Sequence, residues 1–287
     1  MTDSAPLLAC EGLTCGYVVG HHEVLAVDDV SLAVHPGEIL GITGPSGCGK
    51  STTLRLISGR ERPDQGRVRM GGVDIWEGAR RAPRLPRPGF VMPVFQDPVA
   101  SLNRRWPIWR SITEPLTVGR RRMSTDERRR IAREQMGRVG LGHLDERALP
   151  ARLSGGQAQR VAIVRALVAE PSLVVADEPT AALDVTTAAG VTRVLREAAD
   201  SLGIALVVVS HDRNFLAVLA DRLMRMDHGR VVERTSREDL QRHDPTRPYP
   251  GHQTVDITPA DAGDPDLEGR STDAPGRPNP CNEELSL

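Results

Sequence analysis

The sequence predicts an α/β fold with a mainly parallel sheet, some antiparallel strand at its ends and a helical insertion in its middle. Three observations support this class. A Gly-rich turn at 44–51 lies between a strand-like run and a helical run. Helical and strand-like segments alternate from residue 159 onward. The near-continuous apolar run at 204–209 is typical of a parallel strand buried on both faces.

The elements before residue 100 are mostly short strands bounded by turns. The exception is a helix at 51–58, which should stop at Gly59 because glycine tolerates the positive φ that ends many helices. Residues 80–89 are rich in Pro and Arg and predict a loop. The expected strands lie at 7–13, 29–34, 38–43, 67–70 and 90–95.

The middle of the chain, at 108–149, has a helical pattern. Within it, Ser124 and Glu127 have the spacing of a capping box, which predicts a helix from there to Val139. Strands and helices alternate again after this insertion. The expected elements are helices at 159–169 and 187–202, strands at 172–176 and 204–209, and a hairpin at 222–233 that turns at 227–229.

A single domain at 1–242, with the helical insertion at about 98–168, accounts for these elements. Residues 243–287 lose apolar periodicity and are rich in Pro, Asp, Gly and Thr, so we expect a disordered tail. The net charge of −1 gives no global drive toward nucleic acid. No run approaches the ~20 apolar residues that cross a bilayer, and the first residues predict no signal peptide. The four cysteines have no metal-ligand or disulfide spacing, which favours a reducing cytoplasm.

The Gly-rich turn matches the phosphate-binding pattern G-x-x-x-x-G-K-S/T. Lys50 is the only lysine among 37 Lys and Arg residues, which suggests that this position requires a compact ammonium group beside a phosphate. Backbone N–H groups of the turn and the start of the following helix would cradle the anion. The candidate nucleotide-binding residues here are Gly44, Pro45, Ser46, Gly47, Cys48, Gly49, Lys50, Ser51 and Thr52, with the Ser51 hydroxyl also placed for Mg²⁺.

Two further segments point to phosphate chemistry. Asp177 and Glu178 end the apolar strand that begins at 173; Asp177 suits a Mg²⁺ site, and Glu178 is placed to polarise an attacking water. Taken alone, such a pair also fits a helix N-cap or a solvated turn. The run 153–157 opens a helix with exposed N–H groups, either as a second anion site or as an ordinary capped helix start. Its candidate binding residues are Ser154, Gly155, Gly156 and Gln157.

These motifs, in this order, resemble the nucleotide-binding subunit of an ATP-binding cassette (ABC) transporter over residues 7–241. Gln96 resembles the family's Q-loop glutamine, residues 182–184 resemble its D-loop, and His211 resembles its switch histidine. Tyr17 is similar to the aromatic residue that often stacks on adenine, although simple packing of a turn tyrosine is the alternative. The resemblance implies an ABC-type P-loop NTPase core with a parallel sheet, an antiparallel β subdomain and an inserted α-helical subdomain.

The resemblance also implies a mechanism and partners. Two cassettes, identical or different, pair head to tail, and each ATP on one Lys50 loop is closed by Ser154 and Gly156 of the other cassette. Mg²⁺ would be held by Ser51, Gln96 and Asp177; the expected catalytic residues are Glu178, as general base or water-orienting group, together with His211 and Gln96. The motion would drive integral membrane permease subunits, served indirectly by an extracytoplasmic solute-binding protein. The chain would then lie in the cytoplasm, on the inner face of the cell membrane.

The segments 94–103 and 112–116 are similar to the branch that imports peptides, nickel or opines. Arg104 departs from that branch, where a proline is usual, and 247–250 only partly matches its closing element. Ala181 replaces the serine usual before the D-loop, which predicts altered coupling between the two ATP sites. The transported solute is not encoded in these motifs.

Three other classes compete with this interpretation. A guanine-nucleotide switch needs a second lysine in its Asn/Thr-Lys-x-Asp element, and this chain has none. Soluble ABC ATPases of DNA repair or translation typically carry two cassettes or a long coiled coil, and this sequence shows neither feature. An accessory ABC ATPase of a phosphonate-degrading (C-P lyase) complex resembles the same branch and stays open.

Cys48 lies beside a helix N-terminus, where the pKa of a thiol tends to fall. We therefore expect that its alkylation blocks nucleotide binding and that ATP protects it. The alternative is that Cys48 is a small filler of the loop.

Overall fold

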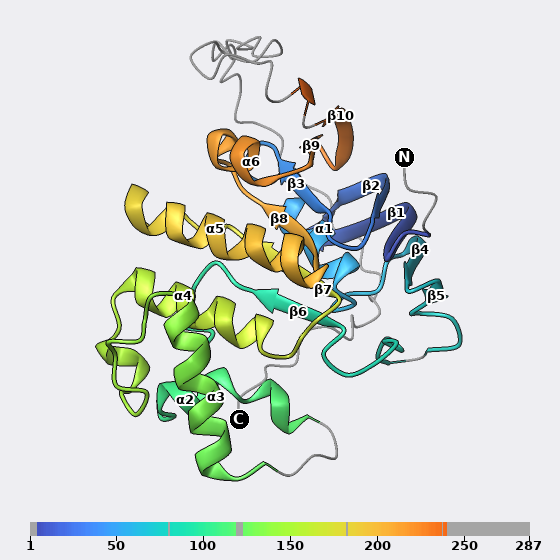
Figure 1. The fold of residues 1–287 in the computed structure, drawn as a ribbon. Helices are drawn as coiled ribbons and strands as arrows, with labels where there is room; N and C mark the ends of the chain where they lie inside the picture. The colour runs from blue at the N-terminus through green and yellow to red at the C-terminus, as the bar shows by residue number, and fades with distance from the viewer. Residues whose placement is uncertain (1–4, 80, 119–122, 182, 237, 240–287) are drawn as a thin grey trace, which may run out of the picture. The chain divides into compact units, whose positions relative to one another are not determined.

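The computed structural model describes residues 5–79, 81–118, 123–181, 183–236 and 238–239. Within these residues the predicted α/β class is confirmed, with two sheets and an inserted group of helices (Figure 1). The predicted tail at 243–287 lies outside the described residues, and the domain limits stay a prediction. No helix in the described part of the chain is long and apolar enough to cross a membrane.

The larger sheet has six strands in the order β10-β9-β3-β8-β7-β6. Neighbouring strands from β9 to β6 run parallel, and β10 pairs antiparallel with β9. The order shows that β3 is central and that β6 lies at an edge. The strands are β3 (Ile39–Thr43), β6 (Val91–Val94), β7 (Leu173–Asp177), β8 (Ala205–Val209), β9 (Arg222–Asp227) and β10 (Arg230–Ser236).

The smaller sheet is antiparallel, with the order β2-β1-β4-β5. Its first two strands are longer than the sequence predicts, because they continue into a hairpin tip that turns at Gly20. Val18, Val24 and Leu25 are exposed at this tip, so no apolar alternation marks it in the sequence. The strands are β1 (Leu8–Val19), β2 (His22–Val34), β4 (Gln65–Met70) and β5 (Val73–Asp74).

Helices surround the larger sheet and form the insertion between β6 and β7 (Figure 1). The insertion contains α2 (Ile108–Ile112), a 3-10 turn η1 (Pro115–Thr117), α3 (Thr125–Arg138), a second turn η2 (Pro150–Arg152) and α4 (Gly155–Leu167). Ser124 caps α3 by accepting a hydrogen bond from Glu127 N, as the sequence predicts. The remaining helices are α1 (Lys50–Ile57), α5 (Val185–Leu202) and α6 (Arg213–Leu219).

Two hydrophobic clusters lie on opposite faces of the six-stranded sheet. In β8, Leu206 and Val208 face the cluster formed with α2 to α6, whereas Val207 and Val209 face the cluster formed with α1 and the smaller sheet. Because both faces of β8 are buried, its sequence is apolar at every position. Gly41 of β3 faces the first cluster, where a Cβ atom would lie 3.0 Å from Leu223 Cδ1.

Candidate active site

The carboxyl ends of the parallel strands lie side by side at one end of the six-stranded sheet. This row of strand ends is called the catalytic edge below; it is distinct from the outermost strands of the sheet. Val94 of β6 pairs with Ala176 of β7, and Val209 of β8 pairs with both Asp177 of β7 and Ile42 of β3. The segments that follow these strands therefore leave from the same edge, which is where parallel α/β sheets bind ligands. They carry the loop 44–49, Gln96, Glu178 and His211.

The loop after β3 depends on glycine at two positions. Gly44 has φ 152, and a Cβ atom there would lie 2.2 Å from Met226 O. Gly49 has φ 102, and a Cβ atom there would lie 2.0 Å from Ala26 O. The loop is therefore packed tightly between β9 and β2, and neither position can take another residue without a backbone shift. Between these two points, Pro45, Ser46 and Gly47 are exposed at the rim.

Helix α1 begins directly at Lys50, and Gly49 provides no side-chain cap. Its first internal hydrogen bond runs from Thr53 N to Gly49 O, so the preceding N–H groups of the first turn are not used by the helix. The Lys50 ammonium lies over the loop, with Nζ 2.8 Å from both Gly44 O and Pro45 O. Together these groups place a positive charge and unused donors at the loop, as anion binding requires. Thr52 is buried, and its hydroxyl accepts from Arg55.

Ser51 and Asp177 form the candidate metal-binding pair. The Ser51 hydroxyl at the start of α1 lies near enough to the Asp177 carboxylate at the end of β7 to affect its titration. Burial raises the pKa of Asp177, and the neighbouring Ser51 hydroxyl partly offsets this shift. The described residues contain no group of three or more His, Cys, Asp or Glu side chains that could hold a metal. A hydroxyl and one carboxylate nevertheless fit Mg²⁺, which takes one or two protein oxygens and completes its shell with water and phosphate.

Glu178 and His211 are brought into direct contact. Glu178 has φ 47, a left-handed conformation that is costly for this residue type. Its backbone N–H donates a hydrogen bond to Val209 O. Its Oε1 atom accepts from His211 N at 3.0 Å and lies 2.9 Å from His211 Nδ1. The Glu178 side chain is 12% exposed and the His211 side chain is 71% exposed, so the acid is held within the edge and the imidazole faces outward.

Val94, the last residue of β6, pairs with Ala176 of β7. Gln96 and Glu178 each lie two residues after these paired positions, so both follow the same end of the sheet. The Gln96 side chain is exposed and forms no hydrogen bond with any residue that the structure describes. Gln96 therefore follows the same end of the sheet as Glu178, and none of the hydrogen bonds among the described residues joins it to Ser51 or Asp177. Its metal-binding role stays a prediction.

The segment 154–157 forms a complete capping box at the start of α4. Ser154 Oγ accepts from Gln157 N at 3.3 Å, and Gln157 Oε1 accepts from Ser154 N at 2.9 Å. Gly155 is exposed, and a Cβ atom on Gly156 would lie 2.6 Å from Thr187 Cγ2. None of the hydrogen bonds among described residues joins this segment to the loop 44–52, so the two candidate anion sites do not form one site within this chain.

Tyr17 has a different environment from the other candidates. Its hydroxyl lies 2.8 Å from both carboxylate oxygens of Glu61 and accepts from Arg55 Nη2 at 2.9 Å. The ring is half-buried against the core cluster of the smaller sheet. Stacking on adenine stays a prediction for Tyr17. In the D-loop, Ala182 lies outside the described residues, and Asp184 caps α5 by accepting from Thr187 N at 2.9 Å.

The expectation that the pKa of Cys48 falls is wrong. The Cys48 thiol is 5% exposed, and burial raises its pKa above the ordinary value; Lys50 lowers the pKa by less than burial raises it. The cause is the packing of the loop, because Sγ would lie 2.7 Å from a Cβ atom on Gly44 and belongs to the core cluster of the smaller sheet. The proximity of a helix N-terminus in the sequence does not reveal this packing.

We expect slow alkylation of Cys48 by iodoacetamide at pH 7, followed residue by residue with mass spectrometry. The rate should rise about tenfold per pH unit from pH 7 to 9, because the raised pKa leaves only a small thiolate fraction in this range. Unfolded protein, labelled in parallel, gives the rate of the free thiol. MgATP should slow labelling of the folded chain further. Equal rates with and without MgATP would contradict the placement of nucleotide at this loop.

The sequence did not single out Ser210, which the structure places against Glu178. Ser210 Oγ lies 3.2 Å from Glu178 Oε2. The available signal was a polar residue at the end of an apolar strand, directly before His211.

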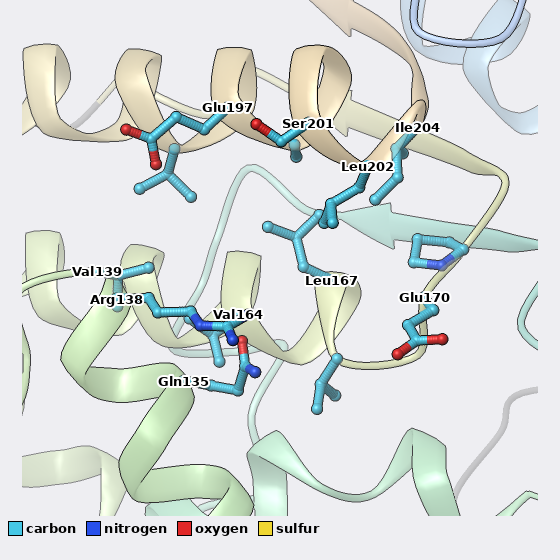
Figure 2. Close-up of a pocket in the computed structure, with 14 residues that line it drawn as sticks. Gln135, Arg138, Val139, Val164, Leu167, Glu170, Glu197, Ser201, Leu202 and Ile204 are labelled. Carbon is cyan, nitrogen blue, oxygen red and sulfur yellow. The ribbon is translucent and has the colours of Figure 1, made fainter.

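A separate pocket of about 420 Å³ lies between the helical insertion and α5. Figure 2 shows Gln135 and Arg138 of α3, Leu167 of α4 and Glu197 of α5 around it. Pro171 and Ile204, which also line it, lie just before β7 and β8. The pocket therefore lies at the amino ends of these strands, opposite the edge that carries the phosphate loop.

The fold and this edge define a phosphate-loop nucleotide-binding protein. The family model described as "ABC transporter" matches residues 27–181. The chain belongs to this family, and its fold is that of an ATP-binding, ATP-hydrolysing cassette.

Transport ATP-binding proteins of bacteria are similar to most of this chain. It is 40% identical over 73% of its length to the probable D,D-dipeptide transport ATP-binding protein DdpF of Escherichia coli, and it spans 63% of that protein. It is 38% identical over 86% of its length to the oligopeptide transport ATP-binding protein OppF of Escherichia coli, and it spans 72% of that protein. The dimeric ATP-binding cassette MJ0796, solved in a post-hydrolysis state with ADP and Pi, superimposes with a TM-score of 0.72. That match has 30% identity and covers 80% of this chain and 98% of MJ0796.

Proposed function

We propose that this chain is the ATP-hydrolysing subunit that powers an importer of peptides or related small solutes. The observation that carries the proposal is the meeting of the Lys50 loop and the Glu178–His211 pair at one strand edge. Relatives named as peptide and dipeptide transport ATP-binding proteins support the choice of solute class.

Phosphate binding is assigned to the loop and to α1. The Lys50 ammonium and the unused N–H groups at the start of α1 would bind the β- and γ-phosphates. Ser51 and Asp177 would hold Mg²⁺, with Gln96 completing the set. When bound, Mg²⁺ neutralises charge on the β- and γ-phosphate oxygens.

Hydrolysis is assigned to Glu178 and His211. Glu178 would orient a water molecule and take one of its protons, while the water oxygen forms a bond to the γ-phosphorus and the bond to the β-phosphate oxygen breaks. His211 is exposed beside Glu178, so its free ring nitrogen can face the γ-phosphate. Positioning by these side chains is the main contribution that phosphoryl transfer needs from a protein.

A second cassette would complete the site. The segment 154–157 has an exposed, capped helix start, and none of the hydrogen bonds among the described residues joins it to the phosphate loop of the same chain. Ser154 and Gly156 would therefore close over the nucleotide of a partner cassette, and Tyr17 would contact adenine. The similarity to a dimeric cassette supports this arrangement.

The other proposed partners are integral membrane permease subunits, and a solute-binding protein would act through them. The chain would then lie on the inner face of the cell membrane. We expect a tagged full-length chain, isolated from gently solubilised membranes, to carry integral membrane proteins and an ABC cassette, identified by mass spectrometry. Recovery with soluble enzyme subunits alone would favour the phosphonate-degrading alternative.

A further inference from the structure

Ser210 is fixed at the catalytic edge by its backbone. It follows β8 directly, is 1% exposed, and donates its N–H to Ile42 O of β3 at 3.1 Å. Its place is therefore set by the register of the two central strands, before any side-chain contact is considered.

The Ser210 hydroxyl has defined donor and acceptor partners. It accepts from Asp212 N at 3.1 Å, and it lies 3.2 Å from Glu178 Oε2. Because Asp212 N can only donate, the single hydroxyl proton is left for Glu178. Asp212 in turn caps α6 by accepting from Phe215 N, so the hydroxyl is anchored to the capped start of this helix.

The two oxygens of Glu178 are used unequally. Oε1 lies within hydrogen-bond distance of both the backbone N and the ring Nδ1 of His211. Oε2 receives only Ser210 among the residues that the structure describes. A carboxylate oxygen accepts about two hydrogen bonds, so the vacant acceptor position of Glu178 is on Oε2.

We propose that Ser210 is a positioning residue that holds Glu178 so that Oε2 presents its free lone pair to the attacking water. This inference rests on the proposed function, in which Glu178 activates that water. The water O–H bond breaks toward Oε2, and the water oxygen bonds to the γ-phosphorus. Ser210 keeps its own proton and touches no reacting atom.

The test is ATP turnover by the full-length chain, in the assembly in which it purifies. Ser210→Ala should lower kcat about tenfold to a hundredfold, the range expected when a catalytic group is misplaced by about 1 Å. KM for ATP should stay within about twofold, because the phosphate loop is untouched and P-loop binding does not depend on Glu178. Ser210→Thr keeps the hydroxyl and should restore most of the lost turnover.

Ser111→Ala is the matched control. Ser111 is also 1% exposed, and its hydroxyl has no hydrogen-bond partner among the described residues of the helical insertion. Ser111→Ala removes a buried hydroxyl oxygen, as Ser210→Ala does, and should leave turnover unchanged. Thermal melting of each variant separates loss of turnover from loss of folding.

A double-mutant cycle with Glu178→Gln distinguishes positioning from a general structural effect. Because Ser210 acts through the Glu178 carboxylate, Ser210→Ala should have no further effect in the Glu178→Gln background, as measured by single-turnover hydrolysis. Wild-type kcat in Ser210→Ala, with Glu178→Gln inactive, would overturn the role of Ser210 and leave the proposed function standing. An equal loss in Ser210→Thr, or a further loss in the double variant, would also overturn it. Full activity of Glu178→Gln would instead overturn the proposed function.

Discussion

Glu178→Gln is expected to reduce ATP turnover by about two to four orders of magnitude, the usual contribution of a general base. ATP binding should be retained, because the phosphate loop is unchanged. The substitution should fit the native site. A glutamine oxygen can accept from His211 N, and its amide can donate to Ser210 Oγ, which has a second lone pair. The measurement is kcat at saturating MgATP, together with equilibrium binding of ATP.

Glu170→Gln is a matched control for this prediction. Glu170 has the same φ of 47 as Glu178 but lies before β7, at the opposite end of the strand. It should show wild-type turnover. If Glu178→Gln also hydrolysed ATP at a rate within about threefold of wild type, Glu178 could not be the general base.

Glu178→Gln should also form a stable ATP-bound dimer with a second cassette. If Ser154 of a partner closes the ATP site, a chain that binds ATP without hydrolysing it should stay associated. We expect size-exclusion chromatography of Glu178→Gln to show an ATP-dependent shift to a dimer, with itself or with its natural partner cassette. A monomer at saturating ATP would contradict closure by the segment 154–157.

The sequence predicted the elements whose signals are local. The run 204–209 is apolar because both faces of β8 are buried, and the loop 44–51 has glycine where a Cβ atom would overlap backbone atoms of β9 or β2. Such signals need no knowledge of distant contacts. Helix α6 was not predicted, because its span at Arg213–Leu219 is too short to show a helical period.

The features that the sequence did not predict depend on strand register and packing. The Ser210–Glu178 contact joins two strands whose pairing is visible only in the sheet, at Asp177↔Val209. The raised pKa of Cys48 results from packing under Gly44, which a motif cannot show. The lack of a hydrogen bond between the described residues of the segment 154–157 and the phosphate loop also follows from packing that the sequence does not reveal. The sequence contains both halves of the proposed site, and the proposal that they act together calls for a second chain.

Lys50→Arg is expected to abolish hydrolysis although it preserves the positive charge. Lys50 Nζ fits between two loop carbonyls, each 2.8 Å away, and a guanidinium group is wider and planar. The loop backbone packs closely against β9, since a Cβ atom on Gly44 would lie 2.2 Å from Met226 O. The loop therefore has no space on this side to widen around a guanidinium group. We expect turnover to fall by about a hundredfold or more, as when one preorganised charge-stabilising donor is lost, and ATP affinity to fall with it.

The control exchanges the same two cations elsewhere. Arg193 is 71% exposed on α5, where it pairs with Glu197 at 3.8 Å, so Arg193→Lys should leave turnover and melting temperature unchanged. Lys50→Arg should also melt near the wild-type temperature, because Lys50 is not part of either core cluster. Its defect should then appear in ATP binding and kcat alone. Near wild-type hydrolysis by Lys50→Arg would show that charge is sufficient at this position, and the single lysine of the chain would lose its chemical explanation.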